Sequence, residues 1–185
     1  MKFTDKLVPF RGHFLIKVEN IVTGKSWIHY DDPNTITLIA KRDTIRLLGG
    51  SPIGQDRVIT KMKFGDGGHV SNPLDPNYGQ AIPTYETQTN LVDPLITKNI
   101  SSVVFYDNNA LNTSQGTFEV ILDTTEGNGP SGTQIYSEAG LFTLIETYID
   151  PVSGNMTSGL FAVKNFPIIT KTAEIRLIFD WTIIL

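Results

Sequence analysis

A glycine-rich segment, GNGPSG at 127–132, has the G-x-G-x-x-G spacing that holds a pyrophosphate in dinucleotide-binding proteins. That chemistry requires the motif to open a helix whose N-terminus faces the phosphates. Here Pro130 and the following Gln134, Ile135 and Tyr136 lead into a strand and not into a helix, so the sequence favours a flexible hairpin loop. A second segment, TGKS at 23–26, matches the end of a P-loop, but Glu19 occupies the position of the first required glycine. We expect a hairpin turn there.

The remaining reactive side chains also lack the spacing of a known site. The three histidines, His13, His29 and His69, form no H-x-H or H-E-x-x-H motif, although His13 and His29 could face each other across a predicted hairpin. There is no G-x-S-x-G motif, and the chain contains no cysteine. We therefore expect a protein that is not an enzyme and that needs no cofactor and no metal.

Composition limits the class of protein further. The chain has 185 residues, which predicts a single domain over 1–185. Lys and Arg number 15 against 19 Asp and Glu, and this net charge of −4 argues against a nucleic-acid partner. No apolar stretch approaches the 18 residues of a membrane span. The absence of cysteine fits maturation in a reducing compartment.

The elements that must position these residues are mostly strands. Alternating or apolar segments bounded by turn residues lie at 13–18, 26–30, 58–64 (with Val58, Met62 and Phe64 on one face), 101–106, 116–123, 134–143, 160–166 and 175–183. The segment 137–148 could instead be a helix, but Gly140 and its β-branched residues make a strand the better interpretation. This pattern predicts a mostly β protein, an antiparallel β-sandwich of jelly-roll or immunoglobulin-like type.

Two local predictions follow from the same pattern. One helix is expected at 35–48, capped by Asn34 and ended by Gly49. In the last strand, Phe179 and Trp181 are two residues apart, so we expect both to be buried on one core face.

Between these elements, 65–98 is rich in Gly, Pro, Asn and Asp and has little periodicity. We predict an extended arm that is mobile in the isolated protomer and ordered against another subunit. The residues expected to contact a partner are the turn that opens the arm and the apolar residues spaced along it: Phe64, Gly65, Asp66, Gly67, Gly68, Leu74, Tyr78, Ile82, Tyr85 and Leu91.

Several short motifs carry a family resemblance. The segment SEAGLFT at 137–143 resembles the S-E-x-G-L-[FY] segment of tailed-bacteriophage tail-fibre and tail-collar proteins. In those proteins a strand of the type L-[FI]-A-x-x-x-F-P-x-x-x-K follows, and here it is LFAVKNFPIITK at 160–171. The turn FGDGG at 64–68 is similar to the F-G-x-G turn before the variable arm of related virion proteins. The stretch between the first two motifs, 144–158, is longer than the tight turn usual in the pattern.

The resemblance implies a non-enzymatic structural component of a phage virion, in the collar or neck, the baseplate or the tail-fibre attachment. Such a protein would assemble in the host cytoplasm, oligomerise and bind neighbouring virion proteins. Gly140 and Glu138 would be structural. The Glu138 carboxylate would accept backbone N–H bonds from an adjacent loop, or else be a solvated acid at a sheet edge.

A different class of function stays open at this point. A carbohydrate- or receptor-binding β-sandwich would use exposed aromatic side chains beside carboxylates and amides. Trp27, Tyr30, Tyr78 and Tyr85 are the candidates.

Overall fold

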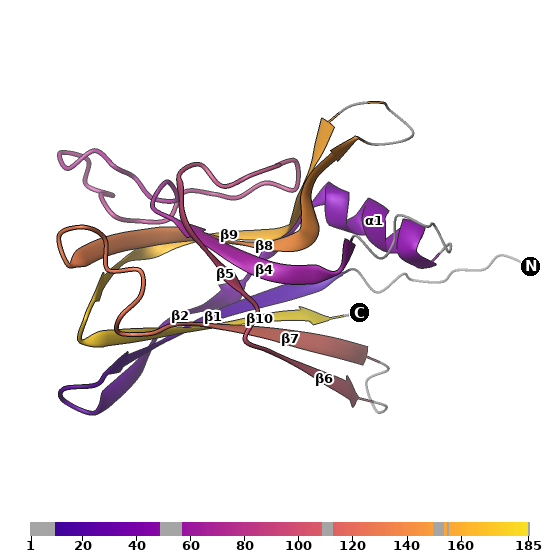
Figure 1. Ribbon diagram of the computed structural model, residues 1–185. Helices are drawn as coiled ribbons and strands as arrows, with labels where there is room; N and C mark the ends of the chain where they lie inside the picture. The colour runs from indigo at the N-terminus through magenta and orange to yellow at the C-terminus, as the bar shows by residue number, and fades with distance from the viewer. Residues whose placement is uncertain (1–9, 49–56, 109–112, 150–153, 155, 185) are drawn as a thin grey trace, which may run out of the picture.

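The computed structural model describes residues 10–48, 57–108, 113–149, 154 and 156–184. Two five-stranded antiparallel sheets pack as a sandwich with one short helix, as the sequence predicts (Figure 1). The first sheet has the order β2-β1-β10-β7-β6 and the second the order β3-β9-β8-β4-β5.

The strands of the first sheet are β1 (Arg11–Asn20), β2 (Lys25–Pro33), β6 (Ser102–Asn108), β7 (Thr113–Leu122) and β10 (Ile175–Ile184). The strands of the second sheet are β3 (Thr35–Ile36), β4 (Ile59–Gly65), β5 (Pro94–Asn99), β8 (Thr133–Ile149) and β9 (Met156–Thr172). The helix α1 (Leu38–Leu48) follows β3.

The core lies between the two sheets and is built by alternation along the strands. On β10, Phe179 and Trp181 are fully buried on one face, which confirms that prediction. Phe14 of β1 pairs with Trp181 in register, and their ring centroids lie 4.5 Å apart. Phe64 of β4 closes the gap between the sheets, with its ring centroid 4.3 Å from that of Phe179. Burial of such aromatic side chains is the main favourable term for a fold of this kind.

The helix begins three residues later than predicted. Thr35 and Ile36 pair with β9 as the short strand β3, so the chain is still extended where a helical turn was expected. Thr37 then caps the helix, because its Oγ1 accepts the Ala40 N–H at 3.1 Å. Asn34 is therefore not the cap, and the predicted stop at Gly49 lies outside the described residues.

Two further predictions are corrected by strand pairing. Val58 is exposed rather than on the face of Met62 and Phe64, since the register of β4 against β8 shifts between Ile59 and Lys61. The helical alternative for 137–148 is wrong, because this segment belongs to β8 and pairs with both β4 and β9.

The predicted arm is shorter than 65–98. Gly65 is the last residue of β4, and Pro94–Asn99 form β5 at the edge of the second sheet. The connection between them is 66–93, drawn in magenta and pink above β8 and β9 in Figure 1. It contains one isolated bridge, between His69 and Ala81.

Candidate interaction site

A buried carboxylate holds both ends of the connection 66–93. Glu138 lies on β8 and is fully buried. Its Oε1 accepts the N–H of Asp93 at 2.7 Å and the N–H of Gly67 at 3.3 Å, and its Oε2 accepts the N–H of Val92 at 2.8 Å. Glu138 thus has the structural role expected from the sequence, as an acceptor for a neighbouring loop rather than a solvated edge acid.

Glycines allow this close approach. A Cβ atom at Gly65 would collide with the Asp93 carbonyl oxygen, and one at Gly68 would collide with the Ser137 carbonyl oxygen. The two glycines are therefore needed because the connection touches β8 directly. The neighbouring Asp66 lies close to Asp93, and burial together with that second carboxyl raises the pKa of Asp66 above its ordinary value.

A serine and a histidine meet beside Glu138. Ser137 Oγ accepts the Gly68 N–H at 3.0 Å, and His69 Nδ1 lies 2.9 Å from the same oxygen. A serine beside a histidine is the arrangement of an activated nucleophile. Ser137 is fully buried, however, and its hydroxyl already holds the backbone of the connection. The pair therefore fastens the connection to β8.

The middle of the connection is also bonded to its own domain. Ile168 N–H donates to the Gly79 carbonyl at 3.0 Å, and Asn165 Nδ2 donates to the Ile82 carbonyl at 3.1 Å. Leu38 N–H donates to the Glu86 carbonyl at 2.9 Å. The expectation that the arm finds order only on another subunit is thus wrong in its physical premise, because the domain itself supplies these partners.

Leu91 shows the same correction for an apolar anchor. It was expected to bind a neighbour, but it is buried within the protein, in a small cluster with Phe142, Leu160 and Val163. Gly140 makes room for this cluster, since a Cβ atom there would lie 2.8 Å from Leu160 Cδ1 and 3.1 Å from Leu91 Cδ2. Phe64 is likewise a core residue, so neither Phe64 nor Leu91 presents its side chain to a partner.

The other predicted contact residues divide by exposure. Leu74, Tyr85 and Tyr78 are 92%, 62% and 42% exposed, whereas Ile82 is half-buried. These three exposed side chains lie on a connection whose backbone is held at both ends and in the middle. The structure therefore presents apolar groups on a preorganised loop.

A hollow of about 640 Å³ lies where this connection passes the start of β1. Tyr85, Glu86, Arg11 and His13 are among its lining residues. The amide of Asn34, also in the lining, is buried and both its oxygen and its nitrogen lack a hydrogen-bond partner within the described residues. The hollow thus combines an exposed aromatic ring with charged groups and an amide.

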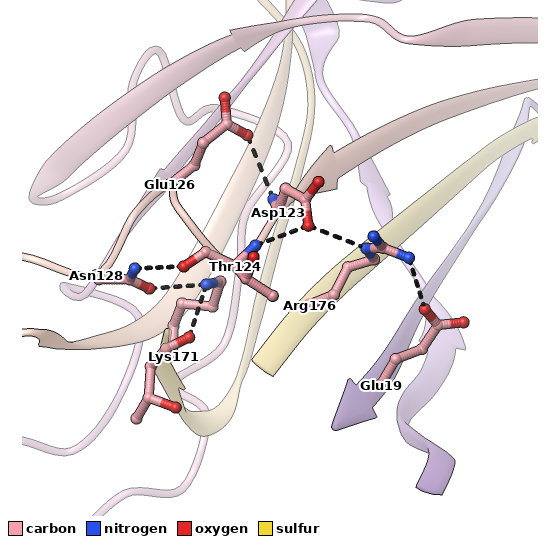
Figure 2. A network of polar contacts seen from close by, with 8 residues as sticks. Glu19, Asp123, Thr124, Glu126, Asn128, Lys171 and Arg176 are labelled. Carbon is pink, nitrogen blue, oxygen red and sulfur yellow. Dashed lines mark hydrogen bonds and ion pairs between the residues drawn. The ribbon is translucent and has the colours of Figure 1, made fainter. Parts of the chain in front are cut away.

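A second polar network lies at the crossover between the two sheets (Figure 2). The G-x-G-x-x-G segment joins β7 of the first sheet to β8 of the second, so it is a loop but not the expected hairpin loop. Lys171 of β9 is fully buried and donates to Asn128 Oδ1 at 2.7 Å and to the Thr172 carbonyl at 2.9 Å. Asn128 Nδ2 in turn donates to the Thr124 carbonyl at 2.6 Å.

The chemistry of this crossover network is structural. Burial lowers the pKa of the Lys171 amine, which would make a better nucleophile of an accessible lysine. This amine has no access to solvent and is bonded to the loop. At the outer end, Arg176 links the loop to β1 through Asp123 at 3.2 Å and Glu19 at 3.3 Å (Figure 2).

The remaining motifs have ordinary surroundings. In TGKS at 23–26, Thr23 and Gly24 lie in the turn between β1 and β2, with Gly24 at φ 67°, and Lys25 and Ser26 begin β2. His13 pairs with Pro33 across this hairpin and forms a 2.8 Å contact with Asp31, so it does not face His29. No group of three or more potential metal ligands occurs within the described ranges. None of the described helical residues form a helix long and apolar enough to cross a membrane.

Comparisons with known proteins give no further assignment. No model of a protein family matches the chain, and no curated protein matches it.

Sequence reasoning missed two features of this surface. One is the hollow beside Asn34, whose lining comes from segments far apart in the chain, so no local spacing marks it. The other is the exposure of β6, whose apolar residues were read as those of an ordinary strand. A run of adjacent apolar residues without alternation, at 103–106, could have indicated that both faces of β6 are apolar.

Proposed function

We propose that this protein is a non-enzymatic structural component of a tailed-phage virion that oligomerises and binds neighbouring virion proteins. The observation that carries the proposal is the loop 66–93, which is bonded to its own sheet and still exposes Leu74, Tyr78 and Tyr85. A contact loop that is already ordered loses little conformational entropy when it binds. The resemblance of the motifs at 137–143, 160–171 and 64–68 to phage proteins is the reason for proposing a virion and not another kind of assembly.

The motif residues have physical roles consistent with such a module. Glu138 and Lys171 are the two charged residues of the β8 and β9 motifs that are fully buried, and each holds a different loop. The Glu138 carboxylate and the Lys171 amine would keep these two loops in place on the sandwich with any binding partner. On this account the module carries out no reaction and takes no cofactor, and its location is the tail or neck of the particle.

The test is incorporation into particles in infected cells. A phage whose own copy of the gene is deleted is supplied with wild-type protein or with the double variant Leu74→Asp and Tyr78→Asp. We expect the wild type to enter particles and the variant to stay in the soluble fraction while it melts like the wild type. As a control, Thr124→Ser leaves the loop surface unchanged. Equal incorporation of the double variant would contradict the role of the loop.

A second candidate function has one specific observation in its favour. The hollow of about 640 Å³ places Tyr85 beside Glu86 and Arg11, with the amide of Asn34 in its wall. An aromatic ring beside amide and charged groups is suited to a sugar ring, which has an apolar face and a polar rim. A glycan array tests this candidate: binding that is lost in Tyr85→Ala supports it, and an array without signal at high protein concentration contradicts it.

A further inference from the structure

The strand β6 lies at the end of the first sheet and pairs only with β7 in the part of the chain that the structure describes (Figure 1). Its four central side chains are all exposed: Val103 by 40%, Val104 by 62%, Phe105 by 77% and Tyr106 by 55%. Neighbouring residues of a strand point to opposite faces. Both faces of β6 are therefore apolar and left uncovered by the described residues, which also leave one row of its backbone N–H and C=O groups without a strand partner.

The Phe105 ring lies outside the core, on the backbone of β7. Phe105 pairs with Gly116 of β7, and a Cβ atom at that glycine would lie 3.3 Å from the Phe105 ring. The ring therefore covers the backbone of β7 instead of entering the core. Most of its surface is left available to another chain.

The other sheet edges carry the features by which proteins prevent strand pairing, namely shortness, proline, charge and bulges. The strand β3 has two residues, and β5 begins at Pro94 and carries Lys98. The strand β2 carries Lys25, Asp31 and Asp32, and its pairing with β1 shifts register at His29. In contrast, 102–106 contains neither proline nor charge, and β6 pairs with β7 through seven residues without a shift. Among the described edges, β6 is the one open to a further strand.

We infer that β6 pairs with β6 of a second copy of this chain, antiparallel and about a two-fold axis, to join two sandwiches through one continuous sheet. This inference rests on the proposed function and names the surface through which the protein oligomerises. An antiparallel self-pairing is isologous, so the same strand satisfies both sides. Charge selects this orientation: Asp107 is the only charged residue of β6, and antiparallel pairing places the two copies of Asp107 at opposite ends, whereas parallel pairing would set them side by side.

The area available gives the expected strength. A fully covered aromatic side chain buries about 150–250 Å². Phe105 and Tyr106, which are 77% and 55% exposed, can therefore contribute up to roughly 200–330 Å² per copy. Two copies reach roughly 400–660 Å² from these side chains, to which the valines and the backbone edge add, whereas a stable interface buries at least about 1,200 Å². We therefore expect a weak dimer that forms only at high protein concentration. Weak pairing is sufficient when an assembly already holds the copies close together.

The experiment is sedimentation velocity over a wide range of concentration. We expect the wild type to shift from monomer to dimer as its concentration rises, and Val104→Lys to weaken the dimer at least tenfold, because the substitution adds like charges at the pairing edge. The matched control is Ile28→Lys on β2, the opposite edge of the same sheet, at a similarly exposed position. This variant should dimerise like the wild type.

A second measurement keeps the inference testable if Val104→Lys folds poorly. The chain has no cysteine, so Val104→Cys introduces a single thiol that should form an oxidised dimer, whereas Ile28→Cys should not. A wild type that stays monomeric at every concentration, or a dimer lost in Ile28→Lys and kept in Val104→Lys, would overturn the inference. Neither result bears on whether the protein enters particles, which the incorporation assay measures separately. A wild type that stays monomeric would count against self-association, and the binding of neighbouring virion proteins would still be tested by incorporation.

Discussion

Replacing Glu138 should destabilise the protein through the connection 66–93. The carboxylate accepts three backbone N–H groups, those of Gly67, Val92 and Asp93. An orphaned buried donor costs about 1–3 kcal/mol, and bonds to a charged acceptor are at the strong end. Some of the freed groups will gain water, since Val92 is exposed. We therefore expect Glu138→Ala to lower the free energy of unfolding by about 3–5 kcal/mol.

The conservative variant Glu138→Gln should give an intermediate result. The amide oxygen can replace Oε1 toward Gly67 and Asp93, while the amide NH₂ faces the Val92 N–H and leaves it without an acceptor. One donor in three is then lost, so the expected cost is about 1–3 kcal/mol. Glu174→Gln, at an exposed position of the β9–β10 turn, is the control and should change stability by less than about 0.5 kcal/mol.

The assay is urea denaturation combined with hydrogen exchange. In the isolated wild type the amides of Gly67, Val92 and Asp93 should be protected, and in Glu138→Ala they should exchange at least tenfold faster. The prediction fails if Glu138→Ala unfolds at the wild-type urea concentration and keeps those amides protected. That result would mean that the connection is held by its other contacts and that the buried carboxylate is not its anchor.

Three further outcomes follow from the buried groups. Trp181→Ala should cost about 3–5 kcal/mol in a thermal or urea melt, because Trp181 is fully buried, whereas the half-exposed Trp27→Ala should cost far less. Burial and then the charge of Glu119 raise the pKa of Asp180, so Asp180→Asn should raise the melting temperature near pH 7 and lose this advantage as the pH falls toward 3.8. Burial lowers the pKa of Lys171, so wild-type stability relative to Lys171→Met should rise as the pH increases toward 10.5.

Each of these three predictions can be contradicted by a specific result. When a lysine pKa is lowered by folding, the unfolded protein binds more protons than the folded one, so stability rises with pH. When a carboxyl pKa is raised by folding, the unfolded protein binds fewer protons, so stability falls as the pH rises. A Lys171→Met curve parallel to the wild type, or an Asp180→Asn variant that gains stability only in acid, would contradict them. An unchanged melt of Trp181→Ala would refute the burial of the last strand.

The prediction that the protein needs no cofactor and no metal is tested by adding ligands and by removing metal ions. We expect the melting temperature to be the same with EDTA, ATP or NAD as without them. The reason is that the buried amine beside the G-x-G-x-x-G loop is bonded to that loop. A shift of several degrees with any of the three would show a ligand that binds the folded state.

The local pattern was enough to predict the parts of the fold that depend on neighbours in sequence. Phe179 and Trp181 are placed by a period of two on one strand, and Gly24, at positive φ, marks the turn that ends before Lys25. These inferences need no knowledge of which strands pair. For Glu138 the sequence leaves two alternatives, an acceptor for backbone N–H groups of a loop or a solvated acid at a sheet edge, and the burial and bonds of this carboxylate in the structure decide for the first.

The errors arise where distant segments decide local structure. Thr35 and Ile36 are strand rather than helix because β9 pairs with them. The connection 66–93 looked unable to find order by itself, because its partners Glu138, Asn165 and Ile168 lie far along the chain. A loop poor in periodic apolar residues can thus be ordered by backbone hydrogen bonds to a sheet. Leu91 was assigned to a partner for the same reason.

The central claim is the proposal that this chain is a structural protein of a tailed-phage virion. The most direct measurement of it is quantitative mass spectrometry of phage particles purified from infected cells that produce the protein. The account predicts that peptides of the protein remain with the particles through density-gradient purification, at a constant ratio to the other structural proteins. Peptides that are abundant in the infected-cell lysate and absent from the purified particles would contradict a structural role in the virion.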